Sequence, residues 1–127
     1  MPSWVDDKVV SRPLEVKIWP FFRSFFKRIG WMADRIETST VCAFPDTIVV
    51  SPWGSTYYIE LKVMPANLKP SYRPGQLARL QKLRKNKALS FVGTKVGNKY
   101  YVLPPKEVYQ TEDFCEENEL SRRFKRD

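Results

Sequence analysis

The sequence of 127 residues contains no histidine and only two cysteines. The absence of histidine excludes Ser-His and Cys-His catalysis, and it excludes zinc sites with histidine ligands. Cys42 and Cys115 are too few and too far apart to predict a disulfide framework or a cysteine zinc site. Any hydrolytic chemistry in this chain must therefore use carboxylates, lysine and a hard cation.

The chain also lacks a long apolar segment. No run approaches the ~18–20 apolar residues that cross a bilayer. The first ten residues do not have the basic and then apolar pattern of a signal peptide. With 43% hydrophobic residues, the chain is long enough for one domain with its own core. We expect a soluble cytoplasmic protein without a membrane partner.

Acidic residues are missing from one long stretch of the chain. From Lys62 to Lys106 there are 11 Lys or Arg residues and no Asp or Glu, in a protein with 22 basic residues and a net charge of +8. A solvated basic face is one explanation, but a surface that lies along nucleic-acid phosphates is the better one. We expect the phosphate contacts to come from Lys69, Arg73, Arg79, Lys82, Arg84 and Lys85.

Hydrophobic periodicity predicts a small single α/β domain, with a central mixed sheet flanked by helices. We expect helices over 13–29 and 74–85, and strands over 47–50, 56–63, 88–96 and 99–103. Pro20 predicts that the first helix kinks or restarts there. We expect an irregular arm over 1–12, the domain over 13–106, and a charged C-terminal tail or short helix over 107–127.

An acid and a base share one face of an otherwise apolar strand. Glu60 and Lys62 alternate with the apolar residues Ile59, Leu61 and Val63, so the two ionisable side chains lie on the face opposite the core. Burial of an ion is costly unless the ion is paired or ligates a metal. Asp46 begins the preceding strand, and hairpin pairing of the two strands brings it near Glu60.

These residues suggest a metal site. Asp46, Glu60 and the backbone carbonyl of Leu61 are hard oxygen ligands suited to Mg²⁺ or Mn²⁺. Lys62 would orient the attacking water and stabilise charge on a phosphate. Two simpler explanations exist: a surface salt bridge between Glu60 and Lys62 on an edge strand, and a turn role for Asp46 after Pro45.

The same residues resemble a known motif. Pro45-Asp46, a gap of 13 residues and then Glu60-Leu61-Lys62 resemble the PD-(D/E)xK nuclease motif. With the flanking strand residues, a Pro-containing loop and Gln76 opening a basic helix, the pattern over residues 13–105 resembles the virus-type replication-repair nuclease module (VRR-NUC). Archaeal Holliday-junction resolvases are more distant relatives.

The resemblance implies a restriction-endonuclease-like core and further site residues. Gln76 would complete the catalytic set, although a polar residue in a first helical turn is also ordinary. The family carries a glutamate on the first helix, for which Glu15 is the best-placed candidate. Asp34 or Glu37 could serve in its place, or a third acid could be absent.

The resemblance also implies a function. It predicts an Mg²⁺- or Mn²⁺-dependent, structure-selective DNA endonuclease that resolves branched, Holliday-junction-like DNA in viral (bacteriophage) recombination and repair, in the host cytoplasm. It also predicts a homodimer; the aromatic residues of the first helix could supply the contact, or simply a thick core. The alternatives are a non-catalytic basic DNA-binding protein on a relic nuclease fold, and an RNA or mismatch endonuclease on the same core.

Overall fold

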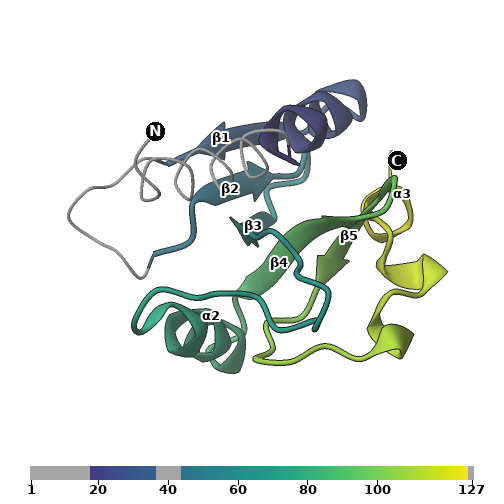
Figure 1. Ribbon diagram of the computed structural model, residues 1–127. Coiled ribbons are helices and arrows are strands. Elements are labelled where there is room, and N and C mark those ends of the chain that lie inside the picture. The colour runs from purple at the N-terminus through teal and green to yellow at the C-terminus, as the bar shows by residue number, and fades with distance from the viewer. Residues whose placement is uncertain (1–17, 37–43, 126–127) are drawn as a thin grey trace, which may run out of the picture.

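The computed structural model describes residues 18–36 and 44–125. Five strands form one sheet in sequence order, namely β1 (Met32–Arg35), β2 (Thr47–Val50), β3 (Thr56–Leu61), β4 (Leu89–Val96) and β5 (Lys99–Leu103). Neighbouring strands are antiparallel except β3 and β4, which are parallel. This mixed sheet and its helices confirm the predicted α/β architecture (Figure 1).

The connections between strands follow from their directions. Antiparallel β4 and β5 are joined by a tight turn at Gly97, which has the positive φ of 62° that this turn requires. Parallel β3 and β4 need a crossover, and α2 (Gln76–Lys85) lies in it. This helix begins two residues later than predicted, because Gly75 before it adopts a left-handed conformation with φ 79°.

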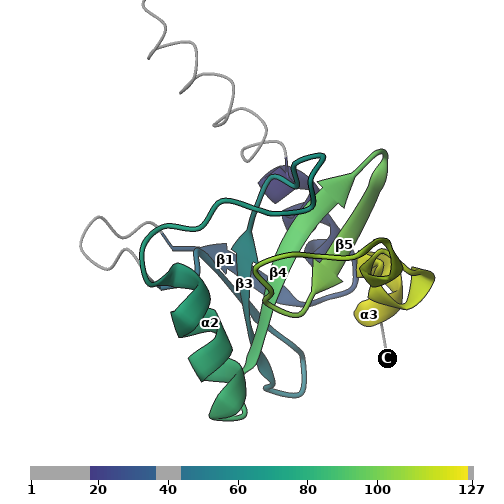
Figure 2. The same ribbon diagram turned by 60° about the horizontal axis from the view of Figure 1, so that its bottom comes forward.

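Two helices cover opposite faces of the sheet (Figures 1 and 2). The helix over residues 18–28 packs Phe22 and Phe26 against Ile59 and Leu61 in the main core. A Cβ atom on Gly93 of β4 would lie 2.8 Å from the Phe22 ring, so only glycine allows this helix to approach so closely. On the other face, α2 packs against β4.

The helix over residues 18–28 continues through Pro20. The helix therefore does not restart at Pro20, while the predicted start at residue 13 lies outside the described residues. The aromatic side chains of this helix serve the core, because Phe22, Phe25 and Phe26 are buried. Phe21 is 39% exposed and stacks on Tyr100, with 3.6 Å between ring centroids. The thick-core explanation therefore accounts for most of these aromatics.

The segment over 107–125, expected as a charged tail or a short helix, packs on the sheet. It forms the 3-10 turns η1 (Thr111–Asp113) and η2 (Glu116–Asn118) and the short helix α3 (Leu120–Arg123). Leu120 and Phe124 enter the main core, and Tyr109 forms a second apolar cluster with Tyr101 and Leu103. None of the helices among the described residues is long and apolar enough to cross a membrane.

Candidate active site

The hairpin of β2 and β3 brings Asp46 and Glu60 together. Thr47 pairs with Ile59, so the residues next to this pair, Asp46 and Glu60, also face each other. The backbone N–H of Asp46 donates to Oε1 of Glu60 over 3.2 Å. In return, the backbone N–H of Leu61 donates to Oδ1 of Asp46, also over 3.2 Å. The predicted proximity of the two acids is therefore a feature of the structure.

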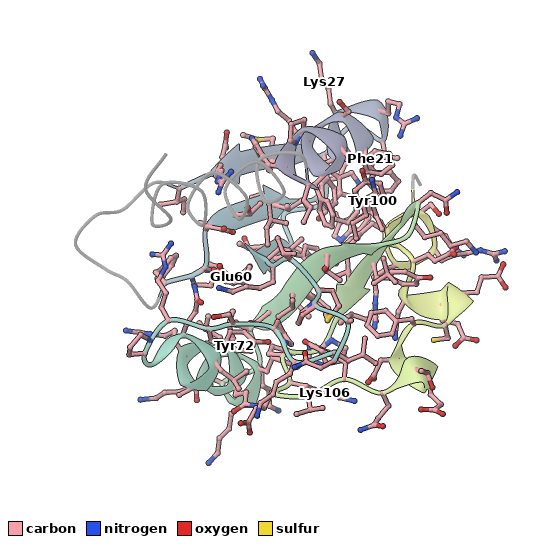
Figure 3. The ribbon with its side chains drawn as sticks, viewed as in Figure 1. Phe21, Lys27, Glu60, Tyr72, Tyr100 and Lys106 are labelled. Carbon is pink, nitrogen blue, oxygen red and sulfur yellow. The ribbon has the colours of Figure 1, made fainter. Side chains whose placement is uncertain are left out.

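Glu60 is buried on the sheet face that α2 covers (Figure 3), and Lys62, two residues further along the chain, is buried as well. Only 3% of Glu60 and 7% of Lys62 is exposed, and β3 is the central strand of the five. The surface salt bridge on an edge strand is therefore the wrong explanation. Nζ of Lys62 lies 3.7 Å from Oε2 of Glu60, which is too long for a hydrogen bond. The two charges attract each other without closing a tight pair.

Burial makes the charged forms of both carboxyl groups costly. Burial, and next the charge of Asp46, raise the pKa of Glu60 from 4.5 to about 8, although the Lys62 charge opposes this shift. Burial also raises the pKa of Asp46, against the Leu61 N–H and the Arg35 guanidinium, whose Nη2 lies 3.9 Å from Oδ2. Such a site gains stability from a proton or from a bound cation.

The donor set fits a hard divalent cation. The N–H and C=O of one strand residue point to the same side, so the Leu61 carbonyl faces the side on which its N–H binds Asp46. Over residues 18–36 and 44–125, no three His, Cys, Asp or Glu side chains gather closely enough to hold an ion by themselves. Two carboxylates and this carbonyl would thus leave positions open for a phosphate and water, as is usual for Mg²⁺.

Of the three candidates for a third acid, only Asp34 lies among the described residues, and the structure does not bring it to this cluster. Asp34 lies on β1 opposite Ile48 and is exposed. Glu15 and Glu37 fall outside the described residues. Instead of an acid, β1 supplies Arg35, a residue that sequence reasoning missed because this strand of four residues has no clear pattern.

Gln76 is the first residue of α2 and is only 1% exposed. Its Oε1 accepts a hydrogen bond from the backbone N–H of Arg73 over 3.1 Å, which closes the turn into the helix. This contact gives Gln76 a structural task. Its catalytic role stays a prediction.

The predicted DNA-binding residues are all exposed: Lys69, Arg73, Arg79, Lys82, Arg84 and Lys85. Arg73 is close enough for its charge to lower the pKa of Glu60, which links the basic surface to the acidic site. Arg84 also has a structural role. Its Nη1 donates to the Ser90 carbonyl over 2.8 Å, and its guanidinium lies 5.2 Å from the centroid of the Phe91 ring.

Sequence reasoning missed a contact between Lys62 and Tyr72. Nζ of Lys62 lies 5.4 Å from the centroid of the Tyr72 ring, within the range of cation–π attraction. Ten positions and an irregular loop separate the two residues, and no sequence period relates them. Only the folded path of the loop reveals the contact.

The fold is similar to those of known nucleases. One similar solved structure is described as a VRR_NUC domain, with a TM-score of 0.52 and 27% identity, over 61% of this chain and 81% of that one. Another is Hjc of Archaeoglobus fulgidus, a Holliday junction resolvase from an archaeal hyperthermophile, with a TM-score of 0.56 and 18% identity, over 77% of this chain and 83% of that one. No family model and no curated protein matches the sequence. The chain has a VRR-NUC or PD-(D/E)xK resolvase-like fold.

Proposed function

We propose that this protein is a metal-dependent, structure-selective DNA endonuclease that hydrolyses phosphodiester bonds in branched DNA. The observation that carries this proposal is the pair of buried acids, Asp46 and Glu60, beside Lys62 in a resolvase-like fold. Buried carboxyl groups with raised pKa values are costly to keep, and they are typical of sites that bind a cation or move protons.

We assign the cation as Mg²⁺ or Mn²⁺. Asp46, Glu60 and the Leu61 carbonyl would hold it, because oxygen ligands suit these ions and the chain has no histidine to favour zinc. When bound, such an ion polarises the scissile phosphate and acidifies the attacking water. Glu60 must lose its proton to act as a ligand.

The protein residues then perform defined tasks. Lys62 points its N–H groups toward the attacking water and the phosphate oxygens, whose negative charge grows as water attacks phosphorus. The water oxygen forms a bond to phosphorus and the water loses a proton, while the P–O bond to the leaving oxygen breaks and that oxygen takes up a proton. Gln76 is proposed as a supporting residue at the start of α2. The proposed contribution of Glu15 rests on the motif resemblance alone.

DNA binding is assigned to the acid-free stretch. The exposed basic residues of this stretch are carried by α2 and the loop before it, and this helix lies on the sheet side that carries Glu60 (Figure 3). The resolvase named among the similar structures supports branched DNA as the substrate. The resemblance to virus-type nucleases supports a role in viral recombination and repair.

A four-way junction needs two opposed cuts, so we propose that the protein acts as a homodimer with two active sites. The test combines cleavage of four-way, three-way and linear DNA with light scattering at micromolar concentration. We expect preferred cleavage of branched DNA and a dimer mass with four-way DNA. A monomer mass in that complex would contradict junction resolution and leave the nuclease assignment standing. Equal cleavage of all three substrates would contradict structure selectivity.

A further inference from the structure

The loop between β3 and α2 returns over the end of β3 and places Tyr72 against Lys62. The Lys62 ammonium has the Glu60 carboxylate on one side, 3.7 Å away, and the Tyr72 ring on another, 5.4 Å from the centroid. A lysine has four rotatable carbon–carbon bonds and a strongly hydrated head group, so burial at one position requires contacts that hold it there. The Glu60 carboxylate and the Tyr72 ring provide such contacts for Lys62.

Tyr72 is itself held by the segment that follows β5. Its hydroxyl donates to the Lys106 carbonyl over 2.8 Å. The Lys106 N–H in turn donates to the hydroxyl of Tyr109 over 3.1 Å, and this hydroxyl donates to the Pro104 carbonyl over 2.6 Å. Tyr109 is 1% exposed, which makes it a rigid support. Glu60, Tyr72 and Lys106 follow one another on the same side of the sheet in Figure 3.

The loop that carries Tyr72 also depends on this segment for its path. Leu68 has φ 59°, in the left-handed region that residues with a side chain rarely adopt. Its carbonyl accepts a hydrogen bond from the Tyr109 N–H over 2.8 Å, and its side chain packs in the cluster around Tyr109. Tertiary contacts to residues 104–109, and not local preference, therefore set the position of Tyr72.

We propose that Tyr72 is a positioning residue that holds Lys62 beside Glu60, and that residues 104–109 hold Tyr72. The effect on catalysis rests on the function proposed above. The contact between the Tyr72 ring and Lys62 does not depend on that function. The ring attracts the ammonium through its π face and narrows the space in which Lys62 moves. Because catalysis depends on the placement of reacting groups, loss of the ring should slow the chemical step and leave DNA affinity intact.

The test compares Tyr72→Leu, which removes the ring, with Tyr72→Phe, which keeps the ring and removes the hydroxyl. Tyr100→Leu is a matched control, because Nζ of Lys95 lies 5.5 Å from the Tyr100 ring centroid in a second lysine–tyrosine pair. We expect Tyr72→Leu to lower kcat about tenfold with KM unchanged, and Tyr72→Phe to stay within about threefold of wild type. Tyr100→Leu should cut DNA at the wild-type rate.

A second measurement does not depend on activity. A double-mutant cycle compares the urea unfolding of the wild-type protein, Tyr72→Leu, Lys62→Met and the double variant. We expect the effects of the two substitutions on the free energy of unfolding to be non-additive. Additive effects on the free energy of unfolding would overturn the proposal. Two kinetic results would also overturn it: a Tyr72→Leu variant with the wild-type kcat, or a Tyr72→Phe variant as slow as Tyr72→Leu. If the wild-type protein cuts no nucleic acid, the proposed function fails, and a non-additive cycle would still support Tyr72 as the residue that positions Lys62.

Discussion

The backbone N–H of Asp46 donates a hydrogen bond to the Glu60 carboxylate over 3.2 Å, although 14 positions separate the two residues. The return contact, from the Leu61 N–H to the Asp46 carboxylate, has the same length. Each carboxylate is thus fixed by the backbone of the other strand. The two acids are preorganised by the hairpin, so a cation can bind without ordering a loop first.

The first prediction concerns the site residues. Asp46→Asn, Glu60→Gln and Lys62→Ala should each lower kcat by about a thousandfold or more, and double substitutions should cost little more, because the groups act as one unit. DNA affinity should change little. Steady-state cleavage and fluorescence anisotropy check both points, with exposed Glu112→Gln as the control. A Glu60→Gln protein that cuts near the wild-type rate would refute the assignment.

The second prediction concerns stability and pH in the absence of metal. Burial and the Asp46 charge raise the pKa of Glu60 from 4.5 to about 8 in the folded protein. The folded state therefore binds the Glu60 proton more tightly than the unfolded state does, and this binding adds to the free energy of unfolding. The added stability is complete below pH 4.5 and is lost as pH rises through 8. Relative to Glu60→Gln, the wild-type protein should lose about 2–4 kcal/mol between pH 5.5 and 8.5.

Urea unfolding of both proteins with EDTA, at three pH values, measures this difference. Glu112→Gln should follow the wild-type curve, because the Glu112 side chain is exposed. A wild-type stability that runs parallel to that of Glu60→Gln over the whole range would show that Glu60 does not hold a proton in the folded state.

The third prediction concerns metal binding. Because Glu60 must release its proton to ligate a cation, affinity for Mg²⁺ or Mn²⁺ should rise with pH up to about 8, and binding at pH 7 should release protons. Calorimetry in buffers of different ionisation enthalpy counts these protons. Ca²⁺ should support DNA binding without cleavage, because it is larger and looser in its geometry. Undiminished cleavage in excess EDTA would contradict the metal requirement.

The fourth prediction concerns the basic helix. Replacing Arg79, Lys82 and Lys85 by Gln should weaken binding to every DNA sequence alike and reduce the slope of log affinity against log salt by up to roughly 3. The matched control replaces Arg23, Lys27 and Arg28 by Gln. These residues are exposed on the helix over residues 18–28, which covers the other face of the sheet, and Lys27 points away from the sheet in Figure 3. Equal effects of the two triple substitutions would argue against α2 as the DNA contact.

The hairpins and α2 could be predicted from sequence because their signals are local. Alternation along residues 59–62, at the end of β3, separates Glu60 and Lys62 from Ile59 and Leu61, and the two-residue period of a strand is enough to assign their faces. β2, β4 and β5 are likewise short apolar runs bounded by turn residues. The predicted pairing of β2 with β3 then brought Asp46 to Glu60.

Other features depend on contacts between distant segments. β1 is a half-exposed strand of four residues, so Arg35 could not be associated with Asp46. Residues 107–125 look charged in sequence, yet Tyr109, Leu120 and Phe124 are buried at wide and irregular spacing. Tyr72 meets Lys62 through a loop whose path is fixed by that same segment. No local pattern encodes these three relationships.

The most direct test of the central claim is cleavage of four-way DNA by the wild-type protein and by Glu60→Gln, each with Mg²⁺ and with EDTA. We expect the wild-type protein to cut with Mg²⁺ only and Glu60→Gln not to cut, although both proteins should bind the junction with similar affinity. Tight binding by the wild-type protein without cleavage in Mg²⁺ or Mn²⁺ would contradict the proposed nuclease function and identify the chain as a DNA-binding protein on a nuclease fold.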